Sequence, residues 1–516
     1  MKQAFYFLIC LGVLIFTNSC RKDLEFEPST GDLRFSKDTV YLDTVFTNIG
    51  SSTYNLKVYN KSSNDIRIPS IRLASGDASE YRLNVDGMPG KEFQDVEILA
   101  KDSMYVFIET TIDINNLPNL NNEFLYTDKI EFDNGSNQQI VDLVTLVKDA
   151  VFIYPDKDNT TGIVETLTLN IGGETIETEI KGRYLEPAEL TFTNEKPYVV
   201  YGYAAVPNNE TLTIEAGSRV HFHAESGLLV AEGASLHING ELSTDQELLE
   251  NEVILEGDRL ESAFSDVPAQ WDGIWLIEGS VNNMINHATI KNASVGILSE
   301  GNPDEGTNKL TITNSQIYNS SNFGILGRRT SILGENLVIN NAGQSAFAAT
   351  FGGKYNITHS TIANYWNNSF RQFPALLINN FLIDADNVAN LTDLTEANFN
   401  NCIIYGNDNP EFLLENEGEV FNYKFTNCLL RFDNNNLQGN GNYVFDDETF
   451  YVDNEFNQSP DFENPFENMM RIGENSGANG IGNSSFASQV PNDILGESRT
   501  ALPDAGAYQS IVFEED

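Results

Sequence analysis

Four side chains in the last third of the chain have types that could bind or transform a sugar. Asp384, Tyr405 and Arg431 each follow the central aliphatic residue of a repeated segment, and Trp366 stands between two such segments. An acid, a phenol and a guanidinium in line could hydrogen-bond the hydroxyls of a sugar while the aromatic ring stacks on its face. In an enzyme, Tyr405 would carry a proton and Arg431 would neutralise charge. We expect a solvent-facing ligand site here and assign no catalytic residue.

The positions of these side chains depend on a segment design that recurs between residues 286 and 432. A repeat of 20 to 30 residues indicates a solenoid, whose coils would stack at about 4.8 Å, the distance between paired strands. An ordinary antiparallel sandwich would not keep such a period through unlike loops. The central aliphatics are Ile290, Ile317, Val338, Ile362, Ile383, Ile404 and Leu430, spaced 27, 21, 24, 21, 21 and 26 residues. The column after them, expected to point outward, reads Lys291, Tyr318, Ile339, Ala363, Asp384, Tyr405 and Arg431.

A further column, three residues before each aliphatic, predicts a repeated sharp turn. Asparagine tolerates left-handed backbone and hydrogen-bonds neighbouring backbone groups, so a column of asparagines is typical of such turns. Together with the repeat, this predicts a parallel β-helix in which each coil covers the core of the next. The column reads His287, Asn314, Glu335, His359, Asn380, Asn401 and Asn427.

The chain before the repeats has a different pattern. From residue 33 to 148, short alternating runs such as TYNLKVYN (53–60) and SMYVFIETTI (103–112) are separated by turn residues. Short strands at this density are typical of an immunoglobulin-like antiparallel β-sandwich. We assign 149–190 to a connecting β segment, 191–458 to the β-helix and 459–516 to its closing segment.

The N-terminus predicts a cellular address. Lys2 precedes a run of thirteen apolar residues from Ala4 to Phe16, which is too short to span a bilayer and suits a signal peptide. The run is followed by Thr17, Asn18, Ser19 and Cys20, and this resembles a bacterial lipoprotein signal in which the cysteine carries lipid. The usual leucine three residues before the cysteine is replaced by Thr17. Residues 1–20 would be the signal peptide and the polar stretch 21–32 a tether.

Two long stretches, 196–242 and 258–298, and the ending DILGESRTALPDAGAYQ (493–509) support a family resemblance. They resemble a family of Bacteroidota lipoproteins with a right-handed parallel β-helix of the pectin-lyase-like kind. The resemblance covers roughly residues 190 to 510. It implies an all-β fold, with a β-sandwich followed by a right-handed parallel β-helix, and an outer-membrane location on the cell surface or facing the periplasm. It implies no established reaction.

Composition and motifs restrict the function further. A net charge of −45 would repel nucleic acid and anionic membrane surfaces. No CxxC pair or nearby histidine pair completes a zinc site, and we expect neither metal nor cofactor. The NTD, GHG and RIK signatures of polygalacturonase-like hydrolases are missing, and the one DD pair, Asp446 and Asp447, stands alone. We expect a monomer whose membrane contact runs through lipid.

Two further thiols, Cys402 and Cys428, occupy equivalent positions of successive repeats. Their expected separation of about 4.8 Å permits a disulfide, but parallel side-chain directions would strain it. We therefore predict two reduced, stacked core thiols.

These observations leave more than one function open. The hypothesis we favour is a lipid-anchored envelope protein whose β-helix is an adhesive or binding surface for glycans. The alternative is an extracellular polysaccharide lyase or hydrolase with an atypical site, and a purely structural stalk is also compatible with the sequence.

We predict that Cys20 is the lipid attachment site, because the apolar core before it is too short to remain as an anchor. Replacing Cys20 with Ala should leave the protein unlipidated and absent from the membrane fraction. Labelled-palmitate incorporation and detergent partitioning check this, and uptake of label by the variant would contradict it.

Overall fold

The computed structural model describes residues 25–117, 122–301, 306–418, 420–434, 437–439, 441–499 and 502–513. The predicted signal peptide, with Cys20, lies outside these residues. The chain divides into two compact units between Asp149 and Ala150.

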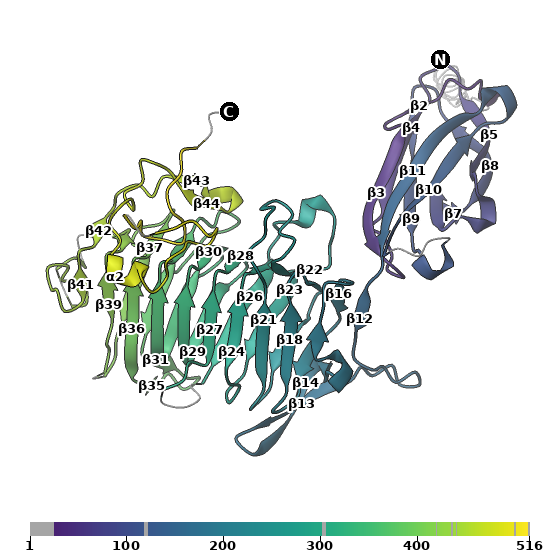
Figure 1. Ribbon diagram of the computed structural model, residues 1–516. Helices are drawn as coiled ribbons and strands as arrows, with labels where there is room; N and C mark the ends of the chain where they lie inside the picture. Colours follow the sequence, from purple (N-terminus) through teal and green to yellow (C-terminus); the bar gives the residue numbers. More distant parts are fainter. Residues whose placement is uncertain are drawn as a thin grey trace, which may run out of the picture. The chain divides into compact units, whose positions relative to one another are not determined.

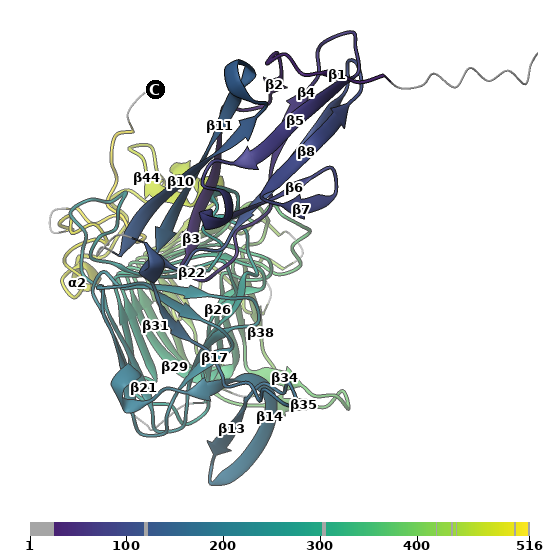
Figure 2. The same cartoon turned by 90° about the vertical axis from the view of Figure 1, so that its right-hand side faces the viewer.

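The first unit is a β-sandwich (Figures 1 and 2). Alternation of buried and exposed side chains builds it: in the strand Ser103–Thr110, Val106 and Ile108 are buried while Tyr105 and Phe107 are exposed. One sheet has the order β1 (Glu27–Pro28), β5 (Ile66–Leu73), β10 (Glu123–Phe132), β11 (Gln139–Lys148), β3 (Thr39–Phe46), with β8 (Glu92–Ile98) beside β5. The other has the order β2 (Arg34–Phe35), β4 (Tyr54–Tyr59), β9 (Ser103–Thr110), β6 (Tyr81–Val85), β7 (Met88–Gly90).

The sandwich begins earlier than expected. Strand β1 pairs in parallel with β5, and the hydroxyl of Ser29 donates to Asp133 Oδ2 at 2.7 Å. The prediction of a tether over 21–32 is therefore wrong for Glu27 onward, because this part of the chain is tied into the first sheet.

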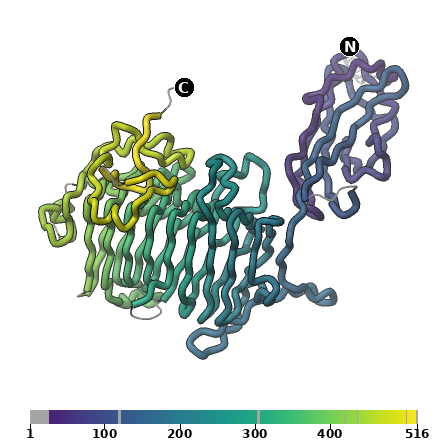
Figure 3. Tube along the Cα trace, in the orientation of Figure 1, coloured from purple at the N-terminus to yellow at the C-terminus, as the bar shows by residue number. Residues whose placement is uncertain are grey.

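The second unit is a parallel β-helix, which confirms the predicted all-β class (Figures 1 and 3). Each coil contributes strands to three faces, A, B and C, in that order. One complete coil shows this: β25 lies on face A, β26 on face B and β27 on face C, and the chain then returns to face A at β28. Inward side chains of all three faces form one continuous apolar core.

Face A consists of β12 (Val151–Ile153), β16 (Tyr198–Val200), β19 (Arg219–Phe222), β22 (Val253–Gly257), β25 (Ala288–Lys291), β28 (Gln316–Ser320), β30 (Val338–Ala342), β32 (Thr361–Asn364), β37 (Ile403–Gly406), β40 (Leu429–Leu430) and β42 (Glu455–Phe456). Face B consists of the end of β14 (Glu174–Tyr184), β17 (Tyr203–Val206), β20 (Gly227–Val230), β23 (Trp271–Leu276), β26 (Ala293–Glu300), the first halves of β29 (Phe323–Glu335) and β31 (Phe347–Thr358), β33 (Leu376–Asn379) and β38 (Phe412–Glu415).

Face C consists of β15 (Thr191–Phe192), β18 (Thr211–Glu215), β21 (Ser235–Asn239), β24 (Asn283–Asn286), β27 (Leu310–Thr313), the second halves of β29 and β31, β36 (Leu394–Asn400), β39 (Lys424–Thr426) and β41 (Tyr451–Val452). Other elements of this unit are the hairpins β13 (Thr166–Ile171) with β14, β34 (Phe381–Ile383) with β35 (Ala389–Leu391) and β43 (Phe462–Asn464) with β44 (Met469–Ile472), the short helix α2 (Ser484–Ala487), and the 3-10 helices η4 (Pro187–Glu189), η5 (Ser262–Phe264) and η6 (Pro465–Glu467).

The predicted turn column largely holds. The residue that opens face A has a positive φ in successive coils: His287, Asn314, Asn336, His359, Asn401 and Asn427, with φ of 43, 47, 53, 46, 51 and 53°. The aliphatic three residues later is buried in the core and pairs with its equivalent in the next coil; these residues are Ile290, Ile317, Ile339, Ile362, Ile404 and Leu430.

Two of the predicted repeat segments are wrong, 334–340 and 379–385, so Glu335, Val338, Asn380 and Ile383 do not hold the positions expected of them. The left-handed residue is Asn336 rather than Glu335, so Ile339 rather than Val338 enters the core. Ile383 lies outside the stack: it belongs to the antiparallel β34–β35 hairpin and is 50% exposed. The core pairing runs from Ile362 directly to Ile404, because the residues between them include this inserted hairpin.

The thiol prediction is confirmed. Cys402 and Cys428 are both free and buried, and the amide nitrogen of Cys402 lies 3.4 Å from Cys428 Sγ. Among the described residues, no helix is both long and apolar enough to cross a bilayer.

We predict that Ile362→Asp lowers the free energy of unfolding by more than about 4 kcal/mol, because a carboxylate would enter the dry core between coils. The matched control is Ile383→Asp, which changes an exposed residue of the hairpin and should cost no more than about 0.5 kcal/mol. Thermal unfolding followed by circular dichroism measures both. Equal losses would contradict the register described above.

Candidate functional site

The structure separates most of the side chains that the sequence placed in one line. Asp384 lies exposed in the β34–β35 turn, where it accepts from the backbone N–H of Val388 at 2.9 Å. Tyr405 and Arg431 are neighbours, with Nη1 donating to the phenol oxygen at 3.1 Å and the guanidinium 5.0 Å from the ring centre. The alignment with Asp384 is therefore wrong, because that residue belongs to an insertion.

The expected exposure of this column is also wrong. Tyr405 is only 6% exposed and Trp366 only 7%. The C-terminal segment from residue 459 lies over face A (Figure 1) and packs Ile472, Ala478 and Ala505 against Tyr405. Arg431 is half-buried. Whether these residues bind a ligand stays a prediction, but they do not form an open surface.

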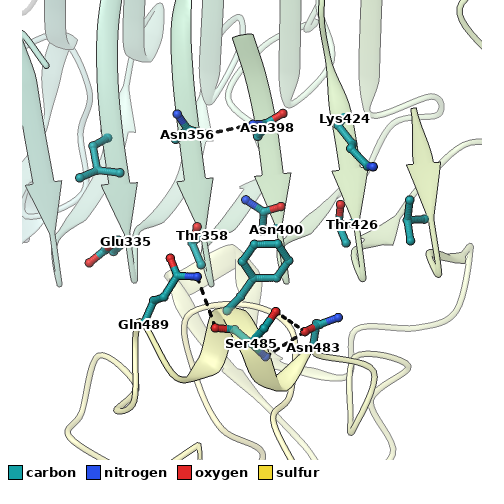
Figure 4. Close-up of a pocket in the computed structure, with 13 residues that line it drawn as sticks. Glu335, Asn356, Thr358, Asn398, Asn400, Lys424, Thr426, Asn483, Ser485 and Gln489 are labelled. Atoms are coloured by element: carbon teal, nitrogen blue, oxygen red, sulfur yellow. Dashed lines mark hydrogen bonds between the residues drawn. The ribbon is translucent and has the colours of Figure 1, made fainter. Parts of the chain in front are cut away.

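A groove lies instead on face C, and three residues deep in its floor, Thr358, Asn400 and Thr426, are 9, 9 and 8% exposed. It has a volume of about 510 Å³ and runs across the last coils beside α2 (Figure 4). We call it the α2 groove. Its lining residues are Leu333, Glu335, Asn356, Thr358, Asn398, Asn400, Lys424, Thr426, Val452, Asn483, Ser485, Phe486 and Gln489.

The floor of the α2 groove consists of two rows of outward side chains. Strand pairing joins Leu333, Asn356, Asn398 and Lys424 in one row, and Glu335, Thr358, Asn400, Thr426 and Val452 in the other. The rows are two residues apart on each strand, so both point to the same side of the sheet. Successive members of a row therefore repeat at about 4.8 Å along the solenoid.

The wall of the groove is held by the same asparagines that turn the coils. The Asn401 amide donates to the carbonyl of Asn483 at 3.0 Å and accepts from its N–H at 2.8 Å. Asn427 donates to the carbonyl of Ile481 at 2.9 Å. The side chain of Asn483 in turn caps α2 by accepting from the N–H of Ser485 at 2.9 Å. These bonds hold the segment that adds Phe486 and Gln489 to the groove lining, and Figure 4 shows Gln489 beside the floor strands.

Neutral hydrogen-bonding groups dominate the floor. The Asn398 amide donates to Asn356 Oδ1 at 3.1 Å and to Glu396 Oε1 at 2.6 Å, which orients its oxygen. Glu335 is the one carboxylate among the lining residues, and burial raises its pKa. The Lys424 ammonium lies three strands away along the sheet. Such a surface can bind a ligand rich in hydroxyl groups by donating and accepting hydrogen bonds along its length.

The groove offers little support for hydrolysis. Glycoside hydrolases generally place two carboxyl groups on either side of the bond they cleave. The lining residues supply only Glu335, with no second carboxylate facing it. No group of three or more histidine, cysteine or acidic side chains that could hold a metal occurs in the described part of the chain.

The sequence contained a partial signal for this groove. Polar residues alternate with core residues in KYNIT (354–358), EANFN (396–400) and KFT (424–426), directly before the left-handed turns. That alternation marks outward positions. The sequence has no comparable pattern that predicts α2 as part of the groove, because α2 lies in a segment about 80 residues further along the chain.

Comparisons with known proteins give only distant similarity. No family model and no curated protein matches the sequence. The catalytic domain of a GH87 α-1,3-glucanase is similar at a TM-score of 0.19 and 10% identity, over 73% of this chain and 81% of that one. A family 123 glycoside hydrolase from Clostridium perfringens gives a TM-score of 0.16 and 10% identity, over 24% of this chain and 30% of that one. The periplasmic chaperone SfaE gives 0.15 and 14% identity, over 23% of this chain and 57% of that one. With TM-scores this low, these similarities assign no activity to this chain.

A histidine beneath the groove wall predicts an acid-sensitive stability. His359 is buried, its Nε2 accepts from the Asn401 amide at 2.8 Å, and burial lowers its pKa from 6.5 to about 3. The unfolded chain therefore takes up a proton that the folded chain excludes. The contribution of neutral His359 to the free energy of unfolding is fully present above pH 6.5. It is lost as the pH falls toward 3, by up to about 1.4 kcal/mol per pH unit.

We predict that His359→Asn removes this dependence, since asparagine occupies the equivalent position of neighbouring coils at Asn336 and Asn401. Urea unfolding of wild type and variant between about pH 7 and 4 should give a shallower acid slope for the variant. His237→Asn, which alters a partly exposed histidine, should keep the wild-type slope. Parallel curves for wild type and His359→Asn would contradict this assignment.

Proposed function

We propose that this protein binds a glycan in the α2 groove and is held at the bacterial cell envelope by lipid on Cys20. The observation that carries the binding proposal is the double row of floor side chains, which is mostly amide and hydroxyl groups, together with the half-buried ring of Phe486 that the α2 segment adds to the lining. A sugar chain offers hydroxyls at regular intervals and apolar ring faces, and both find partners on such a surface.

The floor of the groove favours a glycan over a peptide strand. Peptides often bind by adding a strand to a free sheet edge. The backbone groups of β31, β36 and β39 are already paired with one another in parallel register, so the floor presents side chains only. The net charge of −45 also disfavours nucleic acid and other polyanions.

Binding without turnover is the simpler function for this site. A single carboxylate, Glu335, and a single ammonium, Lys424, lie on different strands with neutral side chains between them. The groove therefore orients a ligand over several coils rather than focusing charge on one bond. The location at the envelope is supported by the signal-like N-terminus and by the family resemblance of its sequence.

The test is a glycan array followed by affinity measurement on the glycans that bind. Asn400→Ala combined with Phe486→Ala should weaken binding by about tenfold or more, since it removes a floor amide and the ring platform. Both side chains point into the groove and α2 is anchored through other residues, so the fold should persist.

Asn239→Ala is the matched control. Asn239 occupies the row of Asn400 on face C, several coils away and outside the groove, and its side chain is exposed. Its replacement should leave affinity unchanged within about twofold. Equal affinity of the double variant and the wild type for every bound glycan would refute the proposed site.

A further inference from the structure

A smaller pocket of about 300 Å³ lies on face B, in coils that precede those of the α2 groove along the solenoid. Its lining is mostly apolar and includes two large aromatic side chains and one carboxylate. The lining residues are Tyr203, Asp272, Gly273, Ile274, Trp275, Ser294, Val295 and Leu298. We call it the Trp275 pocket.

Two glycines create the space in which the aromatic side chains lie. Gly227 pairs with Tyr203 on one side and Gly273 on the other. A Cβ atom on Gly227 would come within 2.8 Å of the Tyr203 ring, so the ring lies directly over this bare backbone. Gly273 has φ of 142°, and a Cβ there would clash with the carbonyl of Val295. The sequence thus keeps this strip of face B free of side chains.

Hydrogen bonds fix the rings around the pocket. The Tyr203 hydroxyl donates to Asp272 Oδ2 at 2.9 Å. The Trp275 indole donates through Nε1 to Glu300 Oε2 at 2.7 Å, while Glu300 Oε1 accepts from Arg328 at 3.2 Å. Trp275 and Tyr203 are both half-buried, so part of each ring remains open to a ligand.

Asp272 has a different electrostatic situation from Glu300. No ion pair to Asp272 is found within the described ranges of the chain, and its side chain accepts a hydrogen bond from the Tyr203 hydroxyl. Its carboxylate is half-buried beside apolar residues, and this burial raises its pKa, with a smaller contribution from the charge of Glu225. Glu225 is itself exposed and paired with Lys181 at 3.2 Å. The pocket therefore holds a negative charge that lacks a cation.

From this geometry we propose that the Trp275 pocket binds an organic ammonium group carried on a body the size of one sugar ring. An ammonium ion would pair with Asp272 while the faces of Trp275 and Tyr203 attract it through their π electrons. A carboxylate ligand would be repelled by Asp272. A neutral ligand would remove the Asp272 carboxylate from water without supplying a countercharge, and this desolvation would cost binding free energy.

This proposal does not rest on the function proposed for the α2 groove. The two sites lie on different faces and share no lining residue. Either one can fail in experiment while the other stands.

The test compares three monosaccharides of similar size: glucosamine, glucose and glucuronate. Trp275 serves as the probe, since Trp271 and Trp366 are buried. Glucosamine should shift the tryptophan emission saturably, and Trp275→Phe should abolish that signal. Glucose should bind at least about tenfold more weakly than glucosamine, and glucuronate should give no saturable change in tryptophan emission. Equal binding of glucose and glucosamine, or no saturable response to glucosamine, would overturn the proposal.

Asp272→Asn should reduce glucosamine affinity about tenfold, to the level of glucose. The matched control is Glu225→Gln, which removes a nearby but exposed charge and should change affinity by no more than about twofold. Circular dichroism checks that both variants fold. Unchanged glucosamine affinity in Asp272→Asn, or an equal loss in Glu225→Gln, would show that Asp272 is not the recognition group. The comparison of the three sugars on the wild type decides the proposal even if a variant does not fold.

Discussion

From β25 onward, the β-helix depends on one residue per coil that is held in the left-handed region where face C turns into face A. A positive φ costs a residue other than glycine about 1 to 3 kcal/mol unless its surroundings compensate. Asparagine lowers that cost, and its amide also bonds to the preceding coil: Asn336 donates to Asn314 Oδ1 at 2.8 Å. A second ladder stands at the other end of face A, where Asn341 donates to Asn319 Oδ1 at 2.6 Å. The stacked amides thus hold the corners of successive coils in register.

These corners decide where functional surfaces can form. With the corner fixed, the aliphatic three residues later must enter the core, and the face C residues one and three positions before the corner must point outward. The corner residues Asn401 and Asn427 also hold the segment that carries α2. Face A is covered in the last coils by the C-terminal segment, whose Gly506 N–H donates to the Asn401 carbonyl at 2.8 Å. The same corner residues therefore help to hold the segment over face A, through the Asn401 backbone carbonyl, and the wall of a groove on face C, through the Asn401 and Asn427 side chains.

Much of this fold could be predicted from the sequence because the repeat is local. The spacing of aliphatics and the asparagine column correctly placed Ile290, Ile317, Ile362, Ile404 and Leu430 in the core. The error at Val338 arose because both it and Ile339 are aliphatic, and only the left-handed φ of Asn336 distinguishes them. Ile383 has the spacing expected of a repeat, but its strand β34 pairs with β35 in a hairpin and not with a strand of a neighbouring coil.

The site was harder to predict because it depends on contacts between distant segments. The outward direction of Tyr405 followed from the period of two, but its burial results from residues near 472 and 505. The α2 groove needs the floor of face C and a helix from residue 484 onward, and no local pattern links them. The Trp275 pocket depends on glycines whose role appears only when three strands are aligned.

The most direct test of the account is a crystal structure of the protein with an oligosaccharide that it binds. We expect the sugar chain to lie across β31, β36 and β39, within hydrogen-bonding distance of Asn398 and Asn400, with one ring against Phe486. A well-ordered oligosaccharide bound on another surface, with the α2 groove empty, would contradict the assignment of this groove as the glycan site.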